Sequence, residues 1–99
     1  MVVFRFRDIG ECLGTRMLGS HIRKELLALI HDNDKVVLDF SGVEIISNSF
    51  ADECIAKLLL CMSFEELKAH TTFKGVNDFV RKNIAIALKR RLEATSTRL

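Results

Sequence analysis

Ser47, Asn48 and Ser49 are three consecutive small polar residues between an extended apolar segment and a segment of helical character. A serine hydroxyl in such a turn can accept a hydrogen bond from a backbone amide of the following helix, or it can accept a phosphoryl group. Asp52 follows Ser49 at the spacing of a weak capping box, which is worth about 1 kcal/mol to a helix. We therefore expect Ser49 to cap the helix, and we rank capping above phosphorylation for this residue.

Asp39 is a second residue that could do chemistry, because its carboxylate ends an apolar run and precedes the turn at Ser41-Gly42. A carboxylate in this position commonly accepts hydrogen bonds from the amides of the turn. Catalysis by Asp39 would need a neighbouring base or a metal ion. The chain has no nucleophile elbow, phosphate-binding glycine loop or HExxH motif, so we expect a non-catalytic protein that uses no cofactor.

The cysteines and histidines lack the spacing of a metal site. Cys12, Cys54 and Cys61 are odd in number, and the histidines are scattered without a CxxC or HxxxH pair. Zinc sites need clustered ligands of these types. We expect no bound metal, and we expect the thiols to be reduced.

Hydrophobic periodicity predicts the elements that hold these residues. Alternation at the N-terminus predicts a strand with Val2, Phe4 and Phe6 on one face, and the apolar run Lys35–Phe40 predicts a central strand. Apolar stripes with helical spacing, opened by caps such as Thr15, predict the helices. The predicted order is a strand at 2–6, a helix that Thr15 caps and that ends near 32–34, a strand at 35–40, an extended piece at 43–46, a helix at 50–62, a helix at 63–70 capped by Ser63, a strand at 71–74 and a helix at 76–93.

These elements predict one α/β domain, with a mixed sheet of about four strands and helices packed against it. The domain is expected to span residues 1–93, and residues 94–99 to form a frayed tail. A composition of 48% hydrophobic and 28% charged residues is typical of globular proteins. The sequence lacks the pattern of a signal peptide or of a transmembrane helix, so we expect a cytoplasmic protein without membrane association.

The segment from Val37 to Asp52 resembles STAS domains, the fold of bacterial anti-sigma-factor antagonists and of sulfate-transporter tails. The similarity is closest to the STAS-like family of unknown function. That family has an apolar strand, an Asp-Phe pair, a Gly-Val step and a Ser-Phe-Ala-Asp run, matched here by Asp39-Phe40, Gly42-Val43 and Ser49-Phe50-Ala51-Asp52. Arg16 is similar to an arginine at the start of the first helix of STAS-like relatives, and we expect an ordinary solvated residue there.

The resemblance implies a protein-interaction module. Anti-sigma-factor antagonists present the corresponding strand-to-helix turn to a GHKL-type ATPase, which phosphorylates a serine there and so switches binding off. Asn48 occupies the position of that serine and cannot accept a phosphoryl group, so a recognition surface is favoured over a switch. Ser49 or Ser47 could be the acceptor only if the turn were shifted. The implied partner-binding residues are Asp39, Ser47, Asn48, Ser49, Phe50 and Asp52.

Two other functions are compatible with the last predicted helix. Basic residues outnumber acidic ones there, so nucleic acid is an alternative partner, with phosphate contacts from Arg81, Lys82, Lys89 and Arg90. This alternative is disfavoured, because the chain has no Trp or Tyr for base stacking and a solvated basic face is more common. Ile86 widens the apolar surface of the same helix, which makes a homodimerisation module the other alternative.

Overall fold

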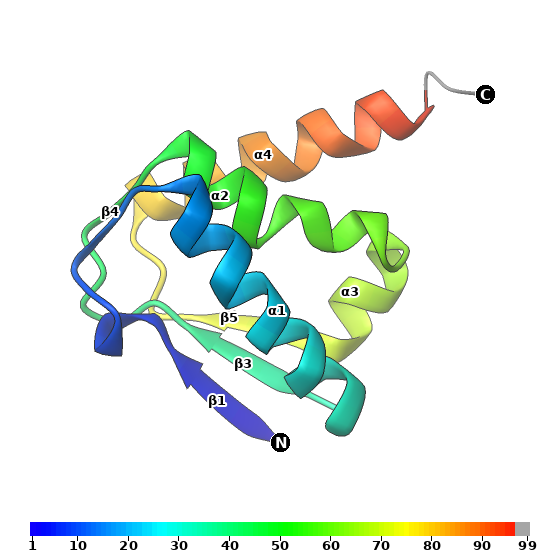
Figure 1. Cartoon of the computed structure of the whole chain (residues 1–99), viewed down its shortest axis with the longest axis horizontal. Helices are drawn as coiled ribbons and strands as arrows, with labels where there is room; N and C mark the ends of the chain where they lie inside the picture. The colour runs from blue at the N-terminus through cyan, green and yellow to red at the C-terminus, as the bar shows by residue number, and fades with distance from the viewer. Residues whose placement is uncertain (97–99) are drawn as a thin grey trace.

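The computed structural model describes residues 1–96, which form an α/β fold on a three-stranded parallel sheet (Figure 1). The strands β1 (Val2–Arg5), β3 (Val36–Asp39) and β5 (Thr71–Lys74) lie in the order β1-β3-β5. Every residue of the central strand β3 is buried. This is the burial that its near-continuous apolar run predicts.

A second, two-stranded parallel sheet pairs β2 (Cys12–Leu13) with β4 (Ile45–Ile46). The sequence predicts one mixed sheet of about four strands, whereas the structure has one sheet of three strands and another of two. All strand pairings within residues 1–96 are parallel. The prediction missed β2 because a two-residue strand is too short for a periodic signal. The Ser47 amide donates to the Leu13 carbonyl at 2.9 Å, which extends this pairing to the turn at Ser47.

The N-terminal strand ends at Arg5, one residue before the predicted end, because the chain enters a short 3-10 helix, η1 (Phe6–Asp8). The predicted alternation is confirmed, since Val3 is exposed and Phe6 is fully buried. The ring of Phe6 stacks on that of Phe40 with centroids 4.0 Å apart, and it meets the ring of Phe50 edge to face at 6.5 Å. These rings form the centre of the core beside the strand-to-helix turn.

The first helix, α1 (Arg16–Asp32), begins as predicted with Thr15 as its cap, whose hydroxyl accepts from the Leu18 amide at 3.1 Å. It packs closely against α2 (Asn48–Cys54). Gly19 is buried at this crossing, and a Cβ added there would lie 2.9 Å from the Cβ of Glu53. The absence of a side chain at Gly19 therefore allows the two helices to approach each other.

The single helix predicted at 50–62 is divided into α2 and a 3-10 helix, η2 (Ala56–Leu60). The segment η2 contacts both α3 and α4, and Ile55, Ala56 and Leu58 are fully buried. Tertiary contacts on more than one side therefore determine the local geometry, which sequence periodicity alone does not report.

The two remaining helices begin at polar caps. Ser63 and Glu66 form the capping box of α3 (Phe64–His70), which confirms the cap predicted at Ser63. In α4 (Asp78–Ser96), the Asn77 side chain accepts from the Val80 amide at 2.7 Å. The helix continues past residue 93 to Ser96, so part of the expected tail is helical. The rest of that tail, residues 97–99, lies outside the described residues.

The helices lie on one side of the three-stranded sheet, with α4 farthest from it (Figure 1). The helix α2 contacts α1 on one side and α4 on the other. Consecutive side chains of α2 can therefore face different helices. Within residues 1–96, no helix combines the length and the apolar character that a membrane crossing requires.

Candidate functional site at the strand-to-helix turn

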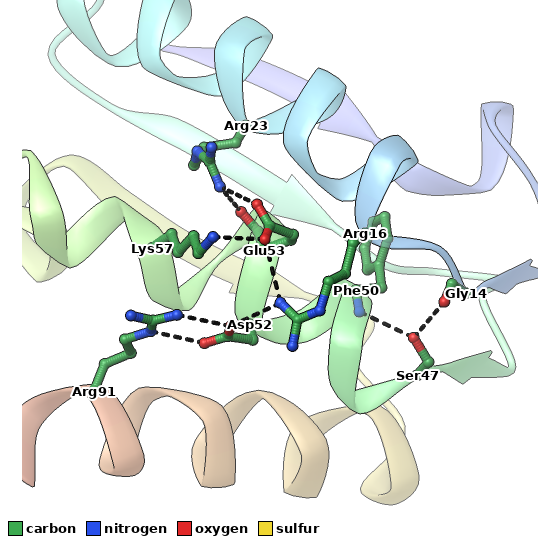
Figure 2. Close-up of polar contacts among 9 residues, drawn as sticks. All are labelled: Gly14, Arg16, Arg23, Ser47, Phe50, Asp52, Glu53, Lys57 and Arg91. Atoms are coloured by element: carbon green, nitrogen blue, oxygen red, sulfur yellow. Dashed lines mark hydrogen bonds and ion pairs between the residues drawn. The ribbon is translucent and has the colours of Figure 1, made fainter. Parts of the chain in front are cut away.

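Ser47 caps α2 and holds the turn in place (Figure 2). Its hydroxyl accepts a hydrogen bond from the Phe50 amide at 2.9 Å and donates one to the Gly14 carbonyl at 2.7 Å. The expectation that Ser49 is the cap is therefore wrong. The sequence contains two serines at the turn, and the parallel pairing of β2 with β4 makes Ser47 the one that lies at the helix end.

The three turn residues have different surroundings. Ser47 uses its hydroxyl both as donor and as acceptor, so this oxygen already has two protein partners. Asn48 is exposed at the surface, and Ser49 is half-buried. The turn thus presents Asn48 outward while Ser47 fixes its backbone.

Asp39 and Phe50 are placed away from the exposed part of the turn. Phe50 is fully buried in the aromatic core, where it positions the turn from inside. The carboxylate of Asp39 accepts from the Ser41 amide at 2.9 Å, which confirms the predicted role in the turn after β3. Hydrogen bonding to the Ser41 side chain and then to its backbone amide, aided by the positive charges of Lys74 and Arg5, lowers the pKa of Asp39.

Asp52 lies between two arginines from distant parts of the chain (Figure 2). Arg91 of α4 binds it with two hydrogen bonds, from Nε at 2.8 Å and from Nη2 at 2.9 Å, and Arg16 of α1 donates at 3.1 Å. The hydrogen bonds from Arg91 and then from Arg16 lower the pKa of Asp52 to about 2. This carboxylate therefore joins α1 and α4 to α2.

Glu53, the next residue, is contacted by three cationic side chains. Lys57 donates to it at 2.6 Å, Arg23 at 2.8 Å and Arg16 at 3.2 Å. Arg23 also donates to the backbone carbonyl of Glu53. The hydrogen bonds from Lys57 and Arg23 lower the pKa of Glu53 to about 2, although burial opposes the change.

A pocket of about 310 Å³ opens beside Asp52, between the turn and α4. We call it the arginine pocket, because Arg16, Arg90 and Arg91 line it together with Asn48, Ser49, Asn83 and Asp52. The amide of Asn83 donates to the Ile46 carbonyl at 2.9 Å, which holds α4 against the strand that leads into the turn. Ile86, which the sequence suggested as part of a dimer surface, is half-buried and lines the same pocket.

Most of the charged network around this pocket joins residues that are distant in the sequence. Arg16 is exposed, as expected, and it also bridges Asp52 and Glu53. The spacing of Glu53 and Lys57 does indicate their ion pair, because residues four apart on a helix are neighbours. No local signal reports Arg91, which lies 39 residues from Asp52 in the sequence.

The cysteines differ in their exposure to solvent. All three cysteines are free; Cys54 is buried, and burial raises the pKa of its thiol. In the part of the chain that the structure describes, no group of His, Cys, Asp and Glu is placed to hold a metal ion.

The basic residues of α4 lie in two places. Arg90 and Arg91 line the arginine pocket, whereas Arg81 pairs with Asp78 and lines another hollow between β5 and α4.

Comparison with protein families places this chain. Residues 19–81 match the model of the STAS-like domain of unknown function. The chain belongs to this family. The match confirms the resemblance found between Val37 and Asp52, and it includes the turn and all of α2. No curated protein and no solved structure matches this STAS-like chain.

Proposed function

We propose that this STAS-like chain is a non-catalytic regulatory module that binds a partner protein through the turn Ser47–Ser49 and the adjoining arginine pocket. The observation that carries the proposal is the rigid construction of the turn. The Ser47 hydroxyl connects it to Gly14, and Asp52 connects the following helix to α1 and α4. A loop that is already ordered loses less conformational entropy on binding than a mobile one.

The surface next to the turn has the polar character of a recognition site. Asn48 is exposed and offers both a donor and an acceptor to a partner. The neighbouring pocket adds arginines, which are enriched at protein interfaces. The buried Phe50 supports this surface from below, so its role is to hold the shape of the site.

A GHKL-type ATPase is the partner class that we propose, on the resemblance of this turn to that of anti-sigma-factor antagonists. The arrangement of the serines favours constitutive recognition over a phosphorylation switch. Ser47 already has two hydrogen-bond partners, and the position of the antagonists' phosphorylated serine is held by Asn48. Ser49 stays the candidate acceptor if the turn is modified at all.

The proposal is tested by a binding assay in which the immobilised chain captures a GHKL-type ATPase from the same genome. The Asn48→Arg variant should abolish capture, because it places a large side chain on the exposed turn. Thr72→Arg is the matched control, since it adds the same side chain at an exposed position of β5. Capture that survives Asn48→Arg would show that the partner does not use this turn.

A further inference from the structure

The arginine pocket and the charges next to it carry a surplus of positive charge. Two carboxylates, those of Asp52 and Glu53, are contacted by four cationic side chains, those of Arg16, Arg23, Lys57 and Arg91. Arg90 brings a further cation to the pocket wall and forms no ion pair with any residue in the range 1–96. The cluster therefore keeps a net positive charge after its internal ion pairs are formed.

The arrangement of these side chains leaves positive charge facing the opening. Asp52 is only 20% exposed, and both of its carboxylate oxygens accept hydrogen bonds from arginines. The Arg16 side chain, by contrast, is 55% exposed and Arg90 is exposed. A guanidinium carries five N–H donors, so the two hydrogen bonds to Asp52 and Glu53 leave Arg16 with donors for a further carboxylate.

The neutral groups of the pocket suit an oxyanion as well. Asn48 and Ser49 lie on its wall and can donate hydrogen bonds to an acceptor. The volume of about 310 Å³ is small and would hold one or two acidic side chains rather than a large cofactor. The exposed Asn48 lines the pocket as well as the turn. A single partner protein docked on the turn could therefore also place a segment in the pocket.

We propose that the arginine pocket is a docking site for an acidic segment of the partner protein, whose Asp or Glu carboxylates bind between Arg16 and Arg90. This inference rests on the proposed function, because it names the chemistry of the partner that meets the turn. The argument for this occupant is charge complementarity, which selects partners and speeds association. An apolar or basic segment would leave the surplus positive charge of the pocket without a counter-charge.

The direct test is a titration of the isotope-labelled full chain with a hexaglutamate peptide, followed by two-dimensional amide NMR. Resonances of Asn48, Ser49 and the Asn83 side chain should move at about 0.02 M salt, and the shifts should be largely lost at about 0.3 M salt, since surface charges are then screened. A hexaglutamine peptide should leave these resonances unchanged. No movement at low salt, or movement with both peptides alike, would overturn the proposal.

Two variants assign the effect to the pocket. Arg90→Gln should weaken binding of hexaglutamate by about threefold, as expected for the loss of one exposed charge contact. Lys89→Gln is the matched control, because it removes the same charge from the adjacent exposed position of α4, outside the pocket. Equal weakening by both variants would show attraction to the whole basic helix, and the proposed site would be wrong.

A second comparison separates this inference from the proposed function. If the partner segment is acidic, Asn48→Glu should weaken capture of the ATPase more than Asn48→Gln does. Arg90→Gln should weaken capture as well. Should Asn48→Arg abolish capture while Arg90→Gln leaves it unchanged, the turn is the interface but the acidic segment is refuted. Should none of these variants affect capture, the interface itself is refuted.

Discussion

Replacing Asp52 with asparagine removes the charge that joins three helices, and its effect on stability can be worked out from the ion pairs. The pKa of Asp52 falls from the ordinary 3.8 to about 2 in the folded chain. At 1.36 kcal/mol per pKa unit this corresponds to roughly 2 kcal/mol. Because Arg16 is 55% exposed and solvent screens its charge, we reduce the expected loss to about 1 kcal/mol.

The loss should depend on pH in a defined direction. The folded pKa of Asp52 is lower than the unfolded one, so its contribution is complete above about pH 4 and disappears as the pH falls through about 2. The free energy of unfolding of Asp52→Asn should therefore lie about 1 kcal/mol below that of the unmodified chain at pH 7. The two chains should converge toward pH 2.

Urea denaturation followed by circular dichroism, repeated at several pH values, measures both effects. Asp8→Asn is the matched control, because Asp8 is exposed and forms no ion pair within residues 1–96. It should change the unfolding free energy by less than about 0.5 kcal/mol. If Asp52→Asn leaves the stability at pH 7 unchanged, or if its effect persists undiminished at low pH, the arginines do not hold this carboxylate as described.

Two further predictions concern the serines and the cysteines. In the same denaturation assay, Ser47→Ala should lower the free energy of unfolding by about 1 to 2 kcal/mol, because the cap and the hydrogen bond to Gly14 are lost. Ser49→Ala should change it by less than about 0.5 kcal/mol. Equal losses would contradict the assignment of Ser47 as the cap. In a thiol-labelling assay at neutral pH, the exposed Cys12 and Cys61 should react in the native chain, while the buried Cys54, whose pKa burial raises, should react only after unfolding. Rapid labelling of all three native thiols would contradict the burial of Cys54.

The sequence predicted the features that depend on neighbouring residues. The caps at Thr15 and Ser63 and the buried strand β3 were predicted from local hydrogen bonding and from apolar patterning. Asp39 was also predicted correctly, because a carboxylate that bonds the amide two residues later needs no tertiary contact. The family was recognised from a short motif that includes the same turn.

Tertiary structure decided which residues of the motif are exposed and which are buried. Both Ser47 and Ser49 fit the pattern of a cap, and the pairing of β2 with β4 determined which one lies at the helix end. The motif implied that both Phe50 and Asp52 bind a partner, yet Phe50 is buried in the core and Asp52 lines a pocket.

The charges show the same division between local and distant contacts. The sequence by itself determined the spacing of Glu53 in α2 and Lys57 in η2, whose ion pair joins residues only four apart in the chain. Arg16 and Arg91 approach Asp52 from 36 and 39 residues away, and only the packing of α1 and α4 on either side of α2 brings them together. The positive pocket beside the turn is therefore a property of the fold, because attraction between charges depends on their separation in space, with a screening length of about 10 Å at 0.1 M salt, and takes no account of distance along the chain.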